Sequence, residues 1–267
     1  MITSIAPADY SARGRLRQQT DPAGRRRAAR QRSGQMRYSL GAMDDRLPWI
    51  LDRLAEQYGR SSPPLSDPID ELVVTILSQN TSDRNAARAF AALKGRYPTW
   101  EETLAAPPAE LAAVIRSGGM ATIKAARIQR TLAAIQERHG TLDLRFLADL
   151  PLDEARRWLA SLPGVGSKTA SCVLLFSFGR PALPVDTHVQ RVARRLGLVP
   201  ERSSPDQIAA MLEARISPAE VFDLHMGLIR HGRQVCLARR PRCASCVLTS
   251  RCPKIGVTAT SGLEGAQ

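Results

Sequence analysis

The sequence predicts an all-α fold, and three observations support this prediction. Aromatic residues make up only 4% of the 267 residues, and Ala, Leu and Arg are plentiful, which favours helix over sheet. From about residue 44, apolar residues recur at helical spacing, and no stretch shows the alternating pattern of a strand. Capping residues and glycines interrupt this pattern as they do between short helices. A chain of this length can form one large domain or two small ones.

Most of the predicted helices have clear start or stop signals. The first is expected to stop at Gly59, and the second begins with Asp67 as its N-cap and Pro68 at the first helical position. Thr99 and Glu102 have the spacing of a capping box, which opens a short helix. The predicted helices cover residues 44–59, 67–80, 82–98, 99–105, 108–119, 122–140, 152–164, 166–179, 185–198, 204–216 and 217–232.

The chain is strongly basic, with a formal net charge of +13 and a pI near 10.5. Such a charge suits a polyanionic partner. No apolar run reaches the roughly 18 residues that a membrane-spanning helix needs, and the N-terminus lacks the apolar segment of a secretory signal. We therefore expect a cytoplasmic protein that does not bind membranes.

Residues 1–43 are predicted to be a flexible basic arm. The first forty residues hold nine Arg against two acidic residues, with Gly, Ser, Gln and Pro between them, and too few apolar residues to form a core. Two alternatives stay open: the true start is Met36 or Met43, or the segment is an Arg-rich transit peptide. Residues 255–267 are predicted to be a disordered tail.

The stretch SLPGVGSKTA, residues 161–170, predicts a tight turn between two helices. Pro163 ends the first helix, the two following glycines free the backbone, and the second helix opens at Ser167. The unpaired N–H groups of such a helix start suit a phosphate oxygen, and the turn resembles a helix-hairpin-helix. The alternative is an ordinary corner between helices. The candidate phosphate-binding residues are Gly164, Val165, Gly166 and Ser167.

Lys168 follows this turn directly. Of the 38 basic residues only Lys94, Lys124, Lys168 and Lys254 are lysines, so the chain generally uses Arg where it needs positive charge. A lysine amine can form a Schiff base with an aldehyde carbon, whereas the guanidinium of Arg stays protonated. Lys168 is therefore a candidate nucleophile. The alternative is a lysine that only contacts phosphate.

A second candidate site residue is Asp186, in the stretch VDTHVQRV. The preceding loop delivers its carboxylate to the start of a helix, where Asp is also a common N-cap. Two helix starts separated by one helix and a loop can converge on one cleft. A carboxylate there would stabilise a cationic sugar or move protons.

Four cysteines lie close together near the C-terminus, with the spacing C-x6-C-x2-C-x5-C: Cys236, Cys243, Cys246 and Cys252. Disulfides are not expected in a chain without an export signal, so the cluster predicts a metal centre. The spacing alone does not decide between zinc and iron–sulfur. Cys172, in an apolar helix, is expected to be a buried core residue. The loop between the first two cysteines also carries three candidate phosphate contacts, Arg239, Arg240 and Arg242.

Together these segments resemble the helix-hairpin-helix DNA glycosylase superfamily, most closely its endonuclease III branch. LPGVGSKTA resembles the family hairpin with its lysine, VDTHVQRV the aspartate segment, and the cysteine spacing the [4Fe-4S] loop. The resemblance covers about residues 46–254. It implies two helical domains with a DNA-binding cleft between them. One would span residues 70–181 and end in the hairpin, and the other would combine 44–69 with 182–254 and hold a [4Fe-4S] cluster.

The resemblance also implies an activity, DNA glycosylase with abasic-site lyase. Lys168 would attack C1′ of a damaged nucleotide, with Asp186 assisting, and the resulting Schiff base would allow cleavage of the strand by β-elimination. The expected partner is double-stranded DNA with a damaged base, such as an oxidised pyrimidine, or an abasic site. The base would be flipped out of the duplex. We expect a monomer that works on DNA at the nucleoid.

Two segments depart from the family pattern, both where side chains fill the gap left by the flipped base. In LSQNTSD either Gln79 or Asn80 takes this role, and a gapless match favours Asn80. In GGMATIKA the wedge residue would be Met120. These changes leave open a monofunctional mismatch glycosylase, although such relatives generally lack a lysine at the position of Lys168. A non-catalytic DNA-binding protein of the same fold is the third reading.

Overall fold

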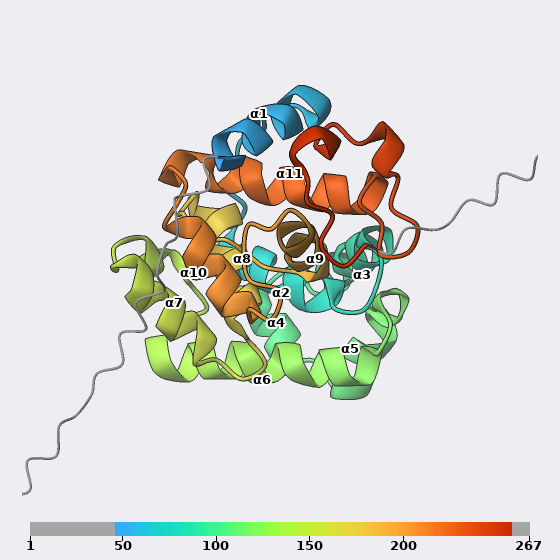
Figure 1. Ribbon diagram of the computed structural model, residues 1–267. Coiled ribbons are helices and arrows are strands. Elements are labelled where there is room, and N and C mark those ends of the chain that lie inside the picture. The colour runs from blue at the N-terminus through green and yellow to red at the C-terminus, as the bar shows by residue number, and fades with distance from the viewer. Residues whose placement is uncertain (1–45, 258–267) are drawn as a thin grey trace, which may run out of the picture. The chain divides into compact units, whose positions relative to one another are not determined.

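The computed structural model describes residues 46–257, and this part of the chain is helical, without a strand (Figure 1). The predicted fold class is confirmed. The predicted arm, residues 1–43, and residues 258–267 of the predicted tail lie outside the described residues. The α-helices are α1 (Arg46–Tyr58), α2 (Pro68–Ser78), α3 (Asp83–Arg96), α4 (Trp100–Ala105), α5 (Pro108–Val114), α6 (Ala121–His139), α7 (Leu152–Ala160), α8 (Ser167–Phe178), α9 (Thr187–Arg195), α10 (Pro205–Glu213) and α11 (Val221–Gln234). Short 3-10 turns are η1 (Arg116–Gly118), η2 (Arg145–Ala148), η3 (Pro218–Glu220), η4 (Cys243–Ser245) and η5 (Thr249–Arg251).

Several helices begin where a side chain satisfies their first backbone N–H groups. The Asp67 carboxylate accepts from the amides of Ile69 and Asp70, as its predicted N-cap role requires. The predicted capping box is also confirmed. The Glu102 amide donates to the Thr99 hydroxyl over 3.2 Å, and the Thr99 amide donates to the Glu102 carboxylate over 3.1 Å. Local sequence therefore sets these helix starts.

Several predicted helices end earlier than expected, among them those expected over 152–164, 185–198 and 204–216, which end at Ala160, Arg195 and Glu213. Two more early ends lie near the candidate site. The helix expected over 67–80 stops at Ser78, because the backbone turns extended at Gln79, and Asn80 then takes a left-handed conformation with φ of 53°. The helix expected over 108–119 ends at Val114 and continues as η1, after which Gly119 has φ of 68°. Both early ends create short loops, and these loops carry the residues expected to enter DNA.

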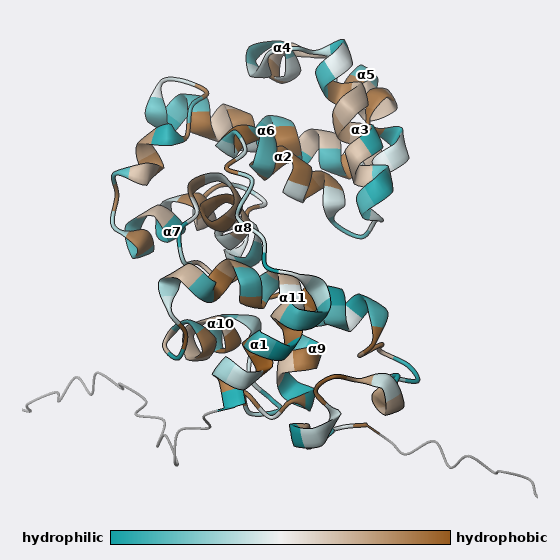
Figure 2. Cartoon of the chain, turned by 90° about the horizontal axis from the view of Figure 1, so that it is seen from above, coloured by the Kyte–Doolittle hydropathy of each residue, from teal (hydrophilic) through white to brown (hydrophobic). Residues whose placement is uncertain are grey.

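Buried apolar side chains form two separate cores. The first core is built from α2 to α8, and the second from α1, α9, α10, α11 and the segment that carries the cysteines. Figure 2 shows the two groups of helices side by side, with α8 between them. α8 serves both cores, because Val173 and Leu174 pack into the first and Leu175 into the second.

Ile69 and Ala182, just outside the predicted 70–181 domain, also pack into the first core, and the division into two domains stays a prediction. Specific polar contacts join the two groups of helices. Glu213 of α10 pairs with Arg156 of α7 over 2.9 Å, and Arg233 of α11 forms a bidentate pair with Asp83 of α3.

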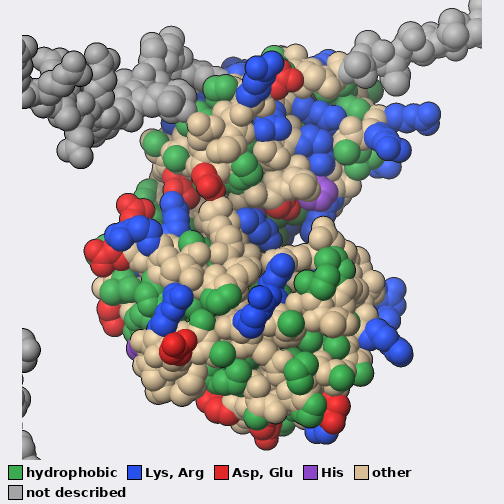
Figure 3. Space-filling view, turned by 90° about the horizontal axis from the view of Figure 1, so that it is seen from below, with side chains coloured by type: hydrophobic (Ala, Val, Ile, Leu, Met, Phe, Trp, Pro, Cys, Tyr) green, Lys and Arg blue, Asp and Glu red, His purple; other side chains and the backbone are tan. Residues whose placement is uncertain are grey.

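Between these groups the surface is hollowed, and Lys and Arg side chains border the hollow (Figure 3). Within residues 46–257, no helix has both the length and the apolar character needed to cross a bilayer.

Candidate active site and cysteine cavity

The hairpin turn joins α7 to α8, as the sequence predicts. Gly164 has φ of 79°, in the left-handed region, and a Cβ there would lie 2.7 Å from Cγ of Arg127. The position therefore requires glycine on both counts. The Pro163 carbonyl lies 2.8 Å from the Thr131 hydroxyl of α6, which fixes the turn against that helix.

Of the four turn residues proposed to bind phosphate, three are exposed and one is buried. Gly164, Gly166 and Ser167 lie at the surface. Val165 is only 5% exposed, and its amide donates to the carbonyl of Leu162, so its side chain serves the first core. No side chain caps α8, and among the described residues no acceptor is found for the Ser167 amide. Such free amides at a helix start suit an anion.

Lys168 and Asp186 both lie close enough to one buried histidine, His225 of α11, for their charges to act on its pKa. This pKa is lowered to about 4, mainly by burial; the Asp186 carboxylate acts to raise it and the Lys168 ammonium to lower it. Lys168 lies in the first turn of α8 and Asp186 is the N-cap of α9, so two helix starts present an amine and a carboxylate to the same region.

Asp186 also carries out the capping role that the sequence allowed. Its Oδ1 accepts from the amides of His188 and Val189, each over 2.8 Å. The loop before it is held by His225, whose Nδ1 lies 3.0 Å from the carbonyl oxygen of Pro184. Because a carbonyl only accepts, Nδ1 carries the proton of this neutral ring.

Polar side chains lie beneath Lys168, where α8 packs on α2. Cys172, one turn after Lys168, is 5% exposed, which confirms the expected core position. Burial raises the pKa of its thiol to about 11, against the effect of the nearby Lys168 ammonium. Burial likewise raises the pKa of Glu71, whose carboxylate accepts from Thr75 over 3.1 Å and Ser66 over 3.3 Å. Lys168 therefore rests on a buried polar layer.

The two candidate wedge residues, far apart in sequence, come together in space. Asn80 and Met120 are both exposed, and the Asn80 amide donates to the Met120 sulfur over 3.9 Å. The alternative wedge, Gln79, is half-buried and accepts a hydrogen bond from Arg127. Asn80 is thus the residue of this loop that projects to the surface beside Met120.

Unusual backbone conformations coincide with candidate DNA contacts. Asn80 and Met120 have φ of 53° and 49°, and Arg240 has φ of 50°. Among the described non-glycine residues only two others have positive φ, Leu65 and Lys254. A non-glycine residue in this region is strained by about 1 to 2 kcal/mol, and such strain tends to collect at functional sites.

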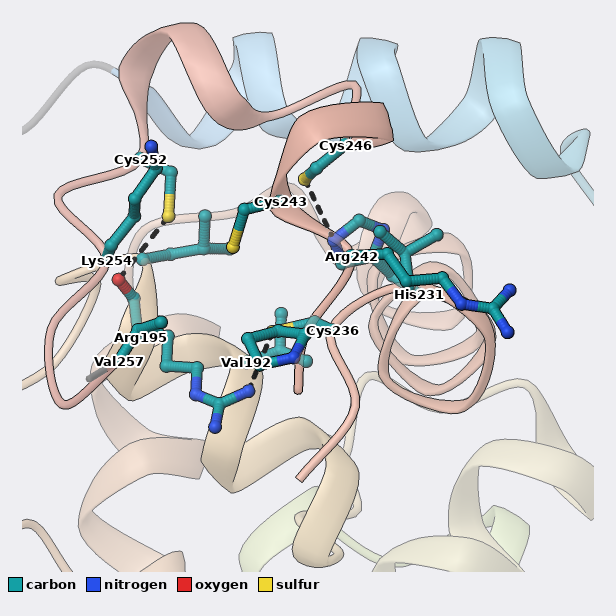
Figure 4. A pocket seen from close by; sticks show the side chains of 13 residues that line it. Val192, Arg195, His231, Cys236, Arg242, Cys243, Cys246, Cys252, Lys254 and Val257 are labelled. Atoms are coloured by element: carbon teal, nitrogen blue, oxygen red, sulfur yellow. Dashed lines mark hydrogen bonds between the residues drawn. The ribbon is translucent and has the colours of Figure 1, made fainter. Parts of the chain in front are cut away.

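The four clustered cysteines line one cavity (Figure 4). They lie near one another, since Cys236, Cys243 and Cys252 all act on the pKa of Cys246, which burial raises. Within the described residues, no three cysteine, histidine or carboxylate side chains are grouped closely enough to hold a single metal ion. Each thiolate of a cubane cluster binds a different iron, so a cluster needs a wider arrangement than one ion does.

Donors surround these sulfur atoms. The Leu248 amide donates to the Cys246 sulfur over 3.4 Å, and Arg195 of α9 donates to the Cys236 sulfur over 3.5 Å. Nε2 of His231 lies 3.5 Å from the Cys246 sulfur, and its Nδ1 lies 3.1 Å from the Tyr58 hydroxyl. The rest of the lining includes Val192, Leu196 and Val235, so the cavity is largely apolar. This environment fits a thiolate-bound iron–sulfur cluster.

The three arginines of the cysteine loop are free for a partner. Arg239, Arg240 and Arg242 are exposed, and no ion pair to their side chains is found among the described residues. By contrast, Arg191 and Arg195 of α9 are engaged. Arg191 donates to the carbonyls of Gly232 and Cys236, and Arg195 donates to those of Leu237 and Ala238.

Several residues of the site carry no sequence motif. His225, Arg127 and Lys124 hold the loops that carry the candidate residues. No motif marks them, because their partners are backbone groups or side chains far away in the sequence. One signal was available for Lys124, since lysine is rare in this chain.

Comparison with known proteins gives one consistent family. The model of the HhH-GPD superfamily base excision DNA repair protein matches residues 73–218, more than half of the chain. An Arabidopsis thaliana protein is 39% identical over 165 residues, which cover 62% of this chain and 56% of that protein. Endonuclease III of Bacillus subtilis is 35% identical over 208 residues, covering 77% of this chain and 91% of the relative.

A solved structure supports the same assignment. Endonuclease III trapped in a covalent intermediate with DNA superposes with a TM-score of 0.69 at 32% identity, over 78% of this chain and 95% of that one. The matched region includes the hairpin, Lys168 and Asp186. The chain belongs to the HhH-GPD superfamily of base excision DNA repair proteins, in its endonuclease III branch.

Proposed function

We propose that the protein removes damaged bases from double-stranded DNA and cleaves the strand at the resulting site, with Lys168 as nucleophile and Asp186 as the assisting carboxylate. One observation carries this proposal. In a chain of the endonuclease III branch, an amine and a carboxylate stand at the starts of two helices, α8 and α9, and the charges of both act on the same buried His225. A non-catalytic DNA-binding protein would need neither group.

The chemistry follows from these two groups. The Lys168 amine attacks C1′ of the damaged nucleotide, the bond from C1′ to the base breaks, and the base leaves and takes up a proton. The Asp186 carboxylate stabilises the positive charge that develops on the sugar. The amine and the opened sugar form a Schiff base. Loss of a C2′ proton then expels the 3′ phosphate, and water hydrolyses the imine to restore the lysine.

The surface around these groups supplies what DNA needs. The free amides at the start of α8 suit a phosphate oxygen, and the exposed guanidinium groups of Arg239, Arg240 and Arg242 suit others. Asn80 and Met120 stand beside each other at the surface and would fill the space left by a flipped base. We propose that one monomer holds the lesion in this way.

We propose that Cys236, Cys243, Cys246 and Cys252 bind a [4Fe-4S] cluster. The apolar cavity and the N–H donors around the sulfur atoms support this. The cluster would cross-link the loop and supply a redox-active group. The cluster takes no part in the steps at C1′. Its proposed role is to hold the arginine-bearing loop in shape.

We further propose an oxidised pyrimidine as the substrate base and the cytoplasmic nucleoid as the place of action. The resemblance of the hairpin lysine to that of the bifunctional relatives supports the first. The basic charge of the chain supports the second.

Borohydride trapping tests the lysine mechanism. Wild type, Lys168→Gln and the control Lys94→Gln are mixed with duplexes that contain an abasic site or a thymine glycol. We expect a covalent adduct with wild type and with Lys94→Gln, and none with Lys168→Gln. If folded, iron-loaded wild-type protein binds the DNA and forms no adduct, the lyase mechanism is wrong. Release of mismatched thymine or uracil without an adduct would instead support a monofunctional glycosylase.

A further inference from the structure

Lys124 is a buried lysine that the proposed chemistry does not use. It lies in the first turn of α6, and only 2% of its surface is exposed. No carboxylate pairs with it in the described part of the chain, and the charge that acts on its pKa is that of Arg127, which is also positive. Burial and Arg127 both lower its pKa. An amine buried without an acid is costly, so this position calls for an explanation.

The amine of Lys124 joins two loops. Its Nζ donates to the carbonyl oxygen of Leu77 and to that of Gly118, each over 2.7 Å. Leu77 lies in the last turn of α2, and Gly118 ends η1. Carbonyls at a helix end have no partner within the helix and carry partial negative charge. The ammonium group of a lysine is compact and has three N–H donors, so it can donate to both carbonyl oxygens at once.

The two loops joined by Lys124 carry the candidate wedge residues. Asn80 follows Leu77 by three residues, and Met120 follows Gly118 by two. Both wedge residues are in the strained left-handed conformation, which persists only where the surroundings fix it. A Cβ at Gly118 would lie 3.2 Å from Cβ of Ala89 of α3, so this loop also packs closely.

Two further residues on the same stripe of α6 continue this arrangement. Arg127, one turn after Lys124, donates to Gln79 and packs under Gly164 of the hairpin. Thr131, one turn later, contacts the Pro163 carbonyl. One face of α6 therefore holds both wedge loops and the hairpin turn.

We propose that Lys124 is a positioning residue for base extrusion, which fixes the spacing of the Asn80 and Met120 loops so that both side chains enter the DNA together. This inference rests on the proposed function, in which these two residues fill the gap left by the flipped base. Lys124 touches neither the sugar nor the base. Its loss should therefore weaken recognition of the lesion and leave the chemistry at Lys168 intact.

The test compares Lys124→Met with wild type. Methionine has an unbranched side chain only one atom shorter than that of lysine, and it removes the donors. Fluorescence anisotropy gives Kd for a duplex with a tetrahydrofuran abasic analogue and for the same duplex undamaged, and borohydride trapping on a natural abasic site reports the chemistry. The Kd ratio is the Kd for undamaged DNA divided by the Kd for the tetrahydrofuran duplex. We expect this ratio to fall about tenfold in Lys124→Met, while the trapping rate at saturating protein changes less than about threefold.

Two controls separate positioning from folding. Ile135→Ala, a fully buried position on the same helix, should weaken both kinds of binding equally if it acts only through stability. In an Asn80→Ala, Met120→Ala background, adding Lys124→Met should change the Kd ratio by less than about twofold, because the two side chains through which Lys124 would affect the DNA are already removed.

An unchanged Kd ratio in Lys124→Met would overturn the inference, whether both Kd values stay the same or rise by the same factor. A full effect that persists in the double-alanine background would also overturn it, since it indicates a general structural role. The proposed function has a separate readout. If wild type forms no adduct at the abasic site, the lysine mechanism fails whatever the Kd ratio shows.

Discussion

Asp186 caps a helix, and we propose that the same carboxylate also acts in the chemistry. Its Oδ1 caps α9 through two backbone amides, and its charge acts on the region around His225. An N-cap requires only an oxygen acceptor, which asparagine also provides, whereas stabilising a sugar cation requires negative charge. The two roles therefore respond differently to substitution.

We predict that Asp186→Asn keeps the stability of the protein and lowers base excision at least about a hundredfold. Asp186→Ala should lose the same activity and also about 1 kcal/mol of stability, because the cap is gone. Chemical denaturation and single-turnover excision measure the two effects. Full activity in a stable Asp186→Asn protein would mean that the residue is only a cap.

The buried His225 leads us to predict how the stability of the protein depends on pH. Burial lowers its pKa from the ordinary value of 6.5 to about 4, so the folded protein resists protonation that the unfolded chain accepts. The neutral His225 contributes its full share to the free energy of unfolding above pH 6.5, and this free energy falls as pH drops from 6.5 toward 4. The slope is on the order of 1 kcal/mol per pH unit. The Lys168 and Asp186 charges nearby act on this pKa in opposite directions.

The measurement is the free energy of unfolding of wild type and His225→Gln between pH 7.5 and 4.5, taken as a difference so that other groups cancel. Glutamine can donate to the Pro184 carbonyl and does not titrate. We expect the wild type to lose stability faster on acidification. Parallel curves would show that His225 is protonated as easily in the folded protein as in the unfolded chain.

At the level of elements, the hairpin turn contains two glycines with different needs. Gly164 has φ of 79° and faces Arg127, whereas Gly166 has φ of −95° and no atom within 4 Å of its missing Cβ. Only Gly164 is required by the fold. Gly166 lies at the N-cap of α8, where an added methyl group would meet an approaching phosphate.

We predict that Gly164→Ala costs about 1 to 3 kcal/mol of stability, because the strained backbone and the displaced Arg127 act together. Gly166→Ala should change stability by less than about 0.5 kcal/mol, yet weaken DNA binding about tenfold. Thermal unfolding and anisotropy distinguish the two. Normal DNA binding by Gly166→Ala would exclude the turn as the phosphate contact.

The elements that could be predicted are those set by local sequence. Asp67, Thr99 and Glu102 cap helices through contacts within four residues, so the sequence reveals them. The loops after α2 and α5 could not be predicted in this way. α2 ends at Gln79, whose backbone is extended, and α5 ends at Ile115, and neither residue type by itself marks a helix end.

The same distinction applies to the site. Lys168, Asp186 and the four cysteines stand in short motifs, so the sequence alone was enough to propose them. Lys124 and His225 could not be found, because Leu77 and Pro184, whose carbonyls they contact, lie 47 and 41 residues away. A lone lysine or histidine in a helix has no pattern that marks such a contact. Only the packing of the helices reveals it.

For the whole molecule, one loop joins the cysteine cavity to the arginines that we propose to contact DNA. Arg191 and Arg195 of α9 hold the first part of this loop, residues 236–238, by its carbonyls. Residues 239–242 carry the three exposed arginines and lie between this anchored part and Cys243. The Arg242 amide donates to the Val235 carbonyl over 2.9 Å, and a cluster bound at Cys243 would add a second, covalent anchor at this end of the segment.

We predict that loss of the cluster in Cys243→Ser releases this loop and removes its phosphate contacts. Each contact contributes about 0.9 to the slope of log Kd against log salt, so the slope for undamaged DNA should fall by about 2 to 3. The first core lies apart from the cavity and should stay folded. An iron-loaded protein with Arg239, Arg240 and Arg242 all changed to Ala should show the same fall. If cluster loss weakens binding while the slope is unchanged, these arginines do not contact phosphate, and the cluster acts on DNA binding through the second core instead.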